Sequence, residues 1–171
     1  MAQRTKTAFE SLYGTSGSLF PTNTTGDISA ADIRAFGDDQ ADSFLFLDTA
    51  YDTIQFIIDG GGSVITTGLK GDIEIPFSCT VLGWTIVTGD NSTGSIVVDI
   101  WKDTYANFPP TVADTITGTE KPTLSAAAKN QDLTLTSFTT ALTRGDWLRY
   151  NVDSAATVTR VTVSLRVQRT S

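Results

Sequence analysis

From residue 53 onward, apolar and polar residues alternate in short runs, which is the pattern of β-strands with one buried face. The clearest run is TRVTVSLRVQR at 159–169, where valine or leucine occupies every second position. The predicted strands lie in the segments 53–59, 63–69, 72–78, 80–88, 95–103, 132–138, 146–153 and 159–169. About eight short strands with turn signals between them predict a mainly β protein, an antiparallel jelly-roll-like β-sandwich.

Two consecutive runs, 80–88 and 95–103, are apolar on both faces, and the segment GDNSTG at 89–94 predicts a hairpin between them. A strand of an antiparallel sandwich usually has one face exposed to solvent. Two apolar faces therefore predict a second burial surface, and a neighbouring subunit is the expected cover. In the long connection 104–132, the segment LSAAAKNQ at 124–131 predicts a short helix.

The first 52 residues have a different pattern, because they begin with a stretch rich in threonine, serine and glycine that has few apolar residues to bury. We expect an N-terminal anchoring arm at 1–52 that carries a short helix at about 30–43, followed by a β-sandwich domain at 53–171. Ser29 and Asp32 have the spacing of a capping box. The apolar residues predicted to form the anchoring face of the helix are Ile28, Ile33, Phe36 and Phe44.

Charge and composition exclude several classes of function. The net charge is −7, which disfavours nucleic-acid binding because that needs a basic surface for phosphates. The chain has no histidine and one cysteine, so histidine-based triads and the usual zinc centres are excluded. The sequence contains no run of 18 apolar residues, so it predicts no membrane span. We therefore expect no catalytic residues, no cofactor and no metal.

Charge is also unevenly distributed along the chain. Eight aspartates lie between residues 27 and 59, where Arg34 is the single basic residue, whereas the last 28 residues carry five arginines and two aspartates. This asymmetry could steer one copy of the chain onto another; solvated faces are the alternative.

Individual acidic residues allow a limited set of hypotheses. Asp72 and Glu74 share one face of a predicted strand at a separation that inverting glycosidases use, but outward carboxylates are also ordinary on a sheet surface. Asp99 lies within an apolar strand and is predicted to pair with Arg149 or Lys102. Cys79 is predicted to be buried and inert. The aspartates at 38, 39 and 42 lack the spacing of a calcium loop and are predicted to form a solvated helix face.

Three aromatic residues follow one another where a predicted strand runs into the long connection: Trp101, Tyr105 and Phe108. Aromatic side chains on a loop at the end of a sandwich can stack on sugar rings or anchor a protein partner. The alternative interpretation is that they close the end of the core. We name them as a possible ligand or receptor contact.

Several motifs resemble a module that recurs in structural proteins of tailed bacteriophages. They are G-x-x-G-x-I-x-I-P-F at 68–77, GSIVVDIWKD at 94–103, FPPT at 108–111 and GDWL at 145–148. The segment TTGDISAADIRAF is similar to the attachment ends of phage tail-fibre and minor virion proteins. This resemblance implies a non-enzymatic knob in the virion, often a homotrimer, joined through its N-terminal arm to capsid or tail proteins.

The resemblance favours a capsid decoration or head-fibre protein, since the chain has no fibre shaft or repeat. The alternative is a short tail-fibre or adaptor protein whose knob binds a glycan on the host surface.

Overall fold

The computed structural model describes residues 33–35, 37, 50–89 and 93–170. The chain divides into two compact units, residues 1–46 and 47–171. In the first unit, residues 33–35 and 37 are helical, inside the predicted helix, and the Ile33 side chain is 57% exposed. Three residues of the predicted anchoring face, Ile28, Phe36 and Phe44, lie outside the described residues, as does the rest of the predicted arm.

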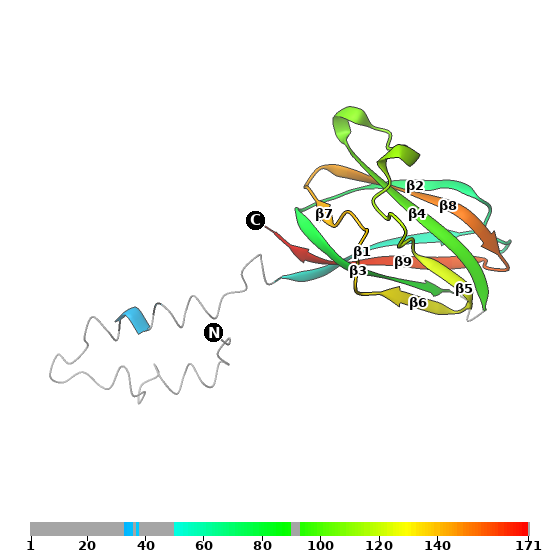
Figure 1. Ribbon diagram of the computed structural model, residues 1–171, viewed down its shortest axis with the longest axis horizontal. Helices are drawn as coiled ribbons and strands as arrows, with labels where there is room; N and C mark the ends of the chain where they lie inside the picture. The colour runs from blue at the N-terminus through cyan, green and yellow to red at the C-terminus, as the bar shows by residue number, and fades with distance from the viewer. Residues whose placement is uncertain (1–32, 36, 38–49, 90–92, 171) are drawn as a thin grey trace. The chain divides into compact units, whose positions relative to one another are not determined.

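The second unit is a mainly β sandwich of two antiparallel sheets, as the sequence predicts (Figure 1). Within the described residues it forms nine strands: β1 (Tyr51–Asp59), β2 (Gly68–Glu74), β3 (Cys79–Thr88), β4 (Gly94–Thr104), β5 (Thr123–Ala127), β6 (Lys129–Asp132), β7 (Ala141–Leu142), β8 (Asp146–Ala156) and β9 (Arg160–Arg169).

The strand order is that of a jelly roll. Sheet A has the order β1-β9-β3-β6, with the short β7 also paired to β3, and sheet B has the order β2-β8-β4-β5. Figure 1 shows β2, β8 and β4 of sheet B above β1, β9 and β3 of sheet A. From β1 to β4, consecutive strands alternate between sheet A and sheet B, so the chain passes from one layer to the other at each connection.

The core lies between the sheets and is built by the period-two pattern of the strands. In β9, Val161, Val163, Leu165 and Val167 are buried, and Ile96, Val98 and Ile100 of β4 face them from sheet B. The rings of Phe56 in β1 and Tyr150 in β8 stack across the layers, with centroids 4.2 Å apart. Gly71 lies beside this stack, where a Cβ atom would come within 3.0 Å of the Phe56 ring.

The predicted hairpin at 89–94 is wrong. Strands β3 and β4 belong to opposite sheets, where β3 pairs with β9, β6 and β7 while β4 pairs with β8 and β5. The connection between them therefore crosses the sandwich, and its residues 90–92 lie outside the described residues. Glycine, asparagine and aspartate suit a connection between layers as well as a hairpin turn, so the local pattern does not separate the two.

The predicted helix at 124–131 is also wrong, because this segment forms β5 and β6. β5 pairs with β4 of sheet B and β6 pairs with β3 of sheet A. Ala126 near the end of β5 has a positive φ of 47°, and the Ala128 carbonyl between the two strands accepts a hydrogen bond from the Thr88 amide at 2.9 Å. Pairing with two existing strands thus overrides the helix propensity of the three alanines.

Candidate functional site

The connection from β4 to β5 carries the predicted contact residues and projects beyond the end of β4 (Figure 1). It begins with two short 3-10 turns, η2 (Tyr105–Asn107) and η3 (Val112–Asp114). Its second half then runs back beside β4, since the Ile116 amide donates to the Ile100 carbonyl at 2.9 Å and Thr115 pairs with Trp101. The second half of the connection is therefore held against β4 by backbone contacts.

The side chains of this returning segment converge on Asp99, which is 1% exposed. The hydroxyls of Thr115 and Thr117 each donate to Asp99 Oδ1 at 2.6 Å, and Lys121 Nζ lies 3.0 Å from Oδ2. Burial, the largest influence, raises the pKa of Asp99, but these donors together lower the pKa below its ordinary value. Asp99 is thus held as a buried anion on the outer side of β4.

The predicted partners of Asp99 are wrong. Arg149 binds Asp72 instead, with Nε at 2.6 Å and Nη2 at 2.9 Å from the two carboxylate oxygens. Lys102 lies 3.3 Å from Asp146. The predicted second apolar face of β4 is also partly covered within one chain, because Asp99 is buried and Trp101 is half-buried there.

Phe108 is fixed by two side chains of β8. Its ring meets Trp147 edge to face, with centroids 5.2 Å apart, and the Arg149 guanidinium carbon lies 5.3 Å from the ring centroid. Arg149 also reaches the Pro110 carbonyl, and its paired carboxylate of Asp72 raises the pKa of the guanidinium. Phe108 keeps 42% of its surface exposed, so the ring is both held in place and accessible.

The three predicted contact residues do not form one cluster. Tyr105 is 77% exposed on η2, where Asn107 Nδ2 donates to Asp103 Oδ1 at 3.1 Å. Trp101 is half-buried and lies opposite Arg149 in the pairing of β4 with β8. Among the described ring contacts, Phe108 meets Trp147 and neither of the other two. The accessible aromatic groups here are therefore Tyr105 and Phe108.

Sequence reasoning missed Trp147, Arg149 and Asp72 as parts of this surface. Trp147 and Arg149 are two residues apart on β8 and so share a face, which was a usable signal. Their position beside Phe108 depends on the pairing of β8 with both β2 and β4, which no local pattern reveals. The same pairing shows that Asp72 is engaged by Arg149, whereas Glu74 remains exposed.

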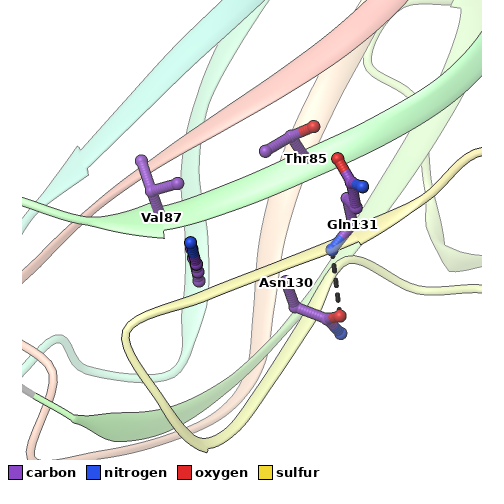
Figure 2. Close-up of a pocket in the computed structure, with 5 residues that line it drawn as sticks. Thr85, Val87, Asn130 and Gln131 are labelled. Carbon is purple, nitrogen blue, oxygen red and sulfur yellow. Dashed lines mark hydrogen bonds between the residues drawn. The ribbon is translucent and has the colours of Figure 1, made fainter.

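The outer face of sheet A has two shallow hollows on either side of the middle of β3. One, of about 320 Å³, is lined by Thr85, Val87, Lys129, Asn130 and Gln131. Figure 2 shows Thr85 and Val87 on β3 beside Gln131 on β6. The other, of about 270 Å³, is lined by Tyr51, Asp52, Leu82, Leu133, Arg166 and Val167.

The remaining candidates have simple environments. Cys79 is buried, and desolvation raises the pKa of its thiol to about 11. The described residues hold no cluster of carboxylate or cysteine ligands suited to a metal ion. None of the helices in the described part of the chain has the length and apolar content to cross a membrane. The aspartates at 38, 39 and 42 lie outside the described residues.

No family model and no curated protein matches the chain. A search of solved structures found a chain in the structure of infectious bursal disease virus Gx strain, at 15% sequence identity and a TM-score of 0.22. The match covers 71% of this chain, which spans 37% of the length of that one. At this TM-score the similarity carries no argument about the fold or the function.

Proposed function

We propose that the protein is a structural component of a tailed-phage virion, attached through its N-terminal arm to capsid or tail and projecting the sandwich as a knob. Within that class, a capsid decoration or head-fibre protein is the form we favour, with the knob assembled as a homotrimer. The proposed role is non-enzymatic, and its partners are other copies of the chain and capsid or tail proteins.

The observation that carries this proposal is that the phage-like motifs meet in sheet B. The motif at 68–77 forms β2 and its exit, the motif at 94–103 forms β4, and GDWL at 145–148 opens β8, which lies between them. Segments up to 77 positions apart therefore belong to one structural unit.

Contacts between the motifs support the same conclusion. The amide of Ile75 donates to the Asp146 carbonyl at 2.8 Å, and Lys102 Nζ lies 3.3 Å from the Asp146 carboxylate. Phe108 of FPPT packs on Trp147 of GDWL. Three motifs thus each contact GDWL, and their packing into one layer supports the proposal that they belong to one module.

The test is to locate the protein and remove its arm. Mass spectrometry of purified particles and immunogold electron microscopy should find it in the virion. A variant that lacks residues 1–26 should keep the circular dichroism and melting temperature of the knob and fail to attach to particles, whereas the full chain attaches. Absence of the protein from particles contradicts the proposal. Attachment of the truncated chain at full occupancy contradicts the anchoring role of the arm.

A second candidate function is binding of a host-surface glycan by the knob, as in a short tail-fibre or adaptor protein. Its support is the exposure of Tyr105 and Phe108 beside a fixed Trp147. Aromatic faces held in place can stack on sugar rings at small entropic cost. Glycan-array binding that falls about tenfold for Tyr105→Ala and Phe108→Ala would support it.

Val112 gives a matched control for that experiment, because it is 67% exposed on the same connection but is not aromatic. Val112→Ala should leave glycan binding unchanged. Equal losses for all three variants, or binding to no host polysaccharide, would remove this candidate.

A further inference from the structure

The outer face of sheet A has few charges and several exposed apolar side chains. The paired residues Gln55, Ser164, Thr85 and Gln131 form one uncharged row across β1, β9, β3 and β6. Apolar groups flank this row: Tyr51, Ile57, Leu82 and Leu133 are 72%, 52%, 38% and 43% exposed. Apolar groups exposed together on one sheet face indicate a contact surface.

The charges on this face are positive where they are unpaired. At one end Arg160 lies 3.6 Å from Asp59. Lys129 and Arg166 have no ion pair with any described residue. Each lines one of the two hollows, Lys129 beside Val87 and Arg166 beside Tyr51 and Leu82. The face therefore offers two hollows of mixed polar and apolar lining, each with a cation, and Asp52 lines the hollow of Arg166 while its carboxylate pairs with Arg169.

A second copy of the same face is a poor occupant, because its own lysine and arginine would be brought against these cations. The segment 27–48 has the opposite character. It carries aspartates at 27, 32, 38, 39, 42 and 48 with Arg34 as its only basic residue, and it contains Ile28, Ile33, Phe36 and Phe44. It therefore supplies anions for the unpaired cations of the face and apolar side chains that can cover those the face exposes.

Two observations on the first unit agree with this complementarity. Residues 33–35 and 37 are helical, and Ile33 is 57% exposed, so an apolar side chain of the segment is available for contact. A helix over the predicted 14 residues is about 21 Å long. The row of strands β1-β9-β3-β6 in sheet A is about 14 Å across from first axis to last, and β9 is about 30 Å long. The face is thus large enough to accept the helix.

We propose that the acidic segment 27–48 of one copy docks on the outer face of sheet A of a second copy, with its aspartates beside Lys129 and Arg166. This contact joins copies of the chain and does not depend on where in a virion, or whether in a virion, the protein is placed. The truncation at residue 26 described above leaves the segment intact, so the two proposals fail separately.

The test uses the full chain and measures its mass by sedimentation equilibrium over a range of protein and salt concentrations. Association should weaken several-fold from 50 to 500 mM NaCl, conditions that shorten the Debye length from about 14 Å to about 4 Å. The double variants Lys129→Glu with Arg166→Glu, and Asp38→Lys with Asp39→Lys, should each associate at least about tenfold more weakly. Each variant should keep the melting temperature of the parent.

A matched control replaces two cations outside sheet A, in the variant Lys70→Glu with Arg144→Glu, which should associate like the parent. The decisive step mixes the two docking variants in equal amounts. The Lys129/Arg166 variant still has its acidic segment, and the Asp38/Asp39 variant still has its basic face, so the mixture should form a mixed complex with about the parental affinity.

Four results would overturn the proposal. In the first, the parent chain stays monomeric at every concentration reached, and in the second, the control variant loses as much affinity as the docking variants. In the third, the mixture of the two docking variants remains monomeric. In the fourth, association survives the Asp38/Asp39 changes but is lost in Leu82→Glu. The first result is the one that docking within one chain would give, the third would show that association does not use this pair of surfaces, and the fourth would place a second sheet A on the face.

Discussion

The ammonium group of Lys121 lies 3.0 Å from the carboxylate of Asp99, and this contact ties the connection between β4 and β5 to the outer side of β4. Asp99 is 1% exposed, whereas Lys121 also reaches Asp153 at 2.7 Å near the surface. Thr115 and Thr117 complete the donors around the acid. A buried carboxylate with three donors positions the whole segment 115–121, because each donor comes from that segment.

Removing this carboxylate is expected to be costly. Asp99→Ala leaves the Thr115 and Thr117 hydroxyls without their carboxylate acceptor and Lys121 with Asp153 alone, and the loss of one partner of a buried ion pair lowers stability by about 3 kcal/mol. Asp153→Ala is the matched control, because Asp153 is more exposed and its pair with Lys121 contributes about 0.5 kcal/mol. Urea denaturation of both variants checks this, and equal losses would contradict the assigned role of Asp99.

The same pair predicts a stability window in pH. Its donors hold the pKa of Asp99 below the ordinary 3.8, so the contribution of Asp99 is present above pH 3.8 and is lost as the pH falls through the lower folded pKa. Hydrogen bonds to Asp153 and Asp99 raise the pKa of Lys121 above 10.5, so its contribution is present below pH 10.5 and lost as the pH rises further. Denaturation midpoints of the parent and of Asp99→Asn should therefore converge at low pH, and their difference should narrow above pH 10.5 as the ion pair with Lys121 is lost.

The sequence predicts the position of a strand better than it predicts which strands a connection joins. The run at 159–169 predicts β9 because every second residue faces the core, a property that belongs to one strand by itself. The sheet to which a strand belongs depends on its partners instead. The pattern at 89–94 therefore predicts a hairpin, and that at 124–131 predicts a helix, although the first segment connects strands of opposite sheets and the second forms two strands that belong to opposite sheets.

The surface around Phe108 was only partly predictable for the same reason. The aromatic residues of the connection were visible in the sequence, and so was the acid Asp99. Their partners were not, because Lys121 lies beyond two turns of the connection and Arg149 comes from a strand placed between β2 and β4. The predicted partners of Asp99 were the cations of the nearest strands, whereas the fold uses a threonine-rich segment that returns beside β4.

The ion pair of Arg149 with Asp72 is expected to hold Phe108 in place. Arg149→Lys keeps the positive charge but loses the two parallel hydrogen bonds and the flat surface beside the ring. We expect stability to fall by about 1 kcal/mol and the resonances of Phe108 and the Trp147 indole to shift. Comparison of Arg149→Lys with Arg149→Met by NMR checks this, and unchanged ring resonances in both would show that Phe108 is held by other contacts.

Glu120 organises the segment that precedes β7. Its two carboxylate oxygens accept hydrogen bonds from the amides of Thr136, Ser137 and Phe138 and from the Thr136 hydroxyl, at 2.6 to 2.9 Å. These donors lower the pKa of Glu120 from 4.5 to about 2, with the Thr136 hydroxyl as the largest influence. Its contribution is therefore present above pH 4.5 and is lost as the pH falls toward 2.

Glu120→Gln should consequently speed hydrogen exchange at the amides of residues 136–138 at neutral pH, while the exchange of β9 amides stays as in the parent. Glu74→Gln, a change at an exposed carboxylate on β2, gives the control and should alter neither set. Unchanged protection of residues 136–138 in Glu120→Gln would mean that the segment is ordered without this carboxylate.

The hydroxyl of Tyr150 gives the last prediction. Tyr150 is 0% exposed and stacks on Phe56 with an interplanar angle of 5°, but its hydroxyl has no hydrogen-bond partner among the described residues. Burial raises the pKa of this hydroxyl well above its ordinary value, so it stays neutral. An unpaired buried hydroxyl lowers stability, and its removal in Tyr150→Phe should raise the free energy of unfolding by about 1 kcal/mol.

A second substitution separates the contribution of the Tyr150 hydroxyl to stability from that of its ring. Tyr150→Leu removes the ring as well and should lower stability by about 2 kcal/mol, since the stack with Phe56 and the packing around it are lost. Tyr105→Phe, on the exposed turn η2, should change the free energy of unfolding by less than about 0.5 kcal/mol. If Tyr150→Phe instead lost 1 kcal/mol or more, the hydroxyl would have to donate to a group inside the sandwich, and the core between Phe56 and Tyr150 would be polar where the structure makes it apolar.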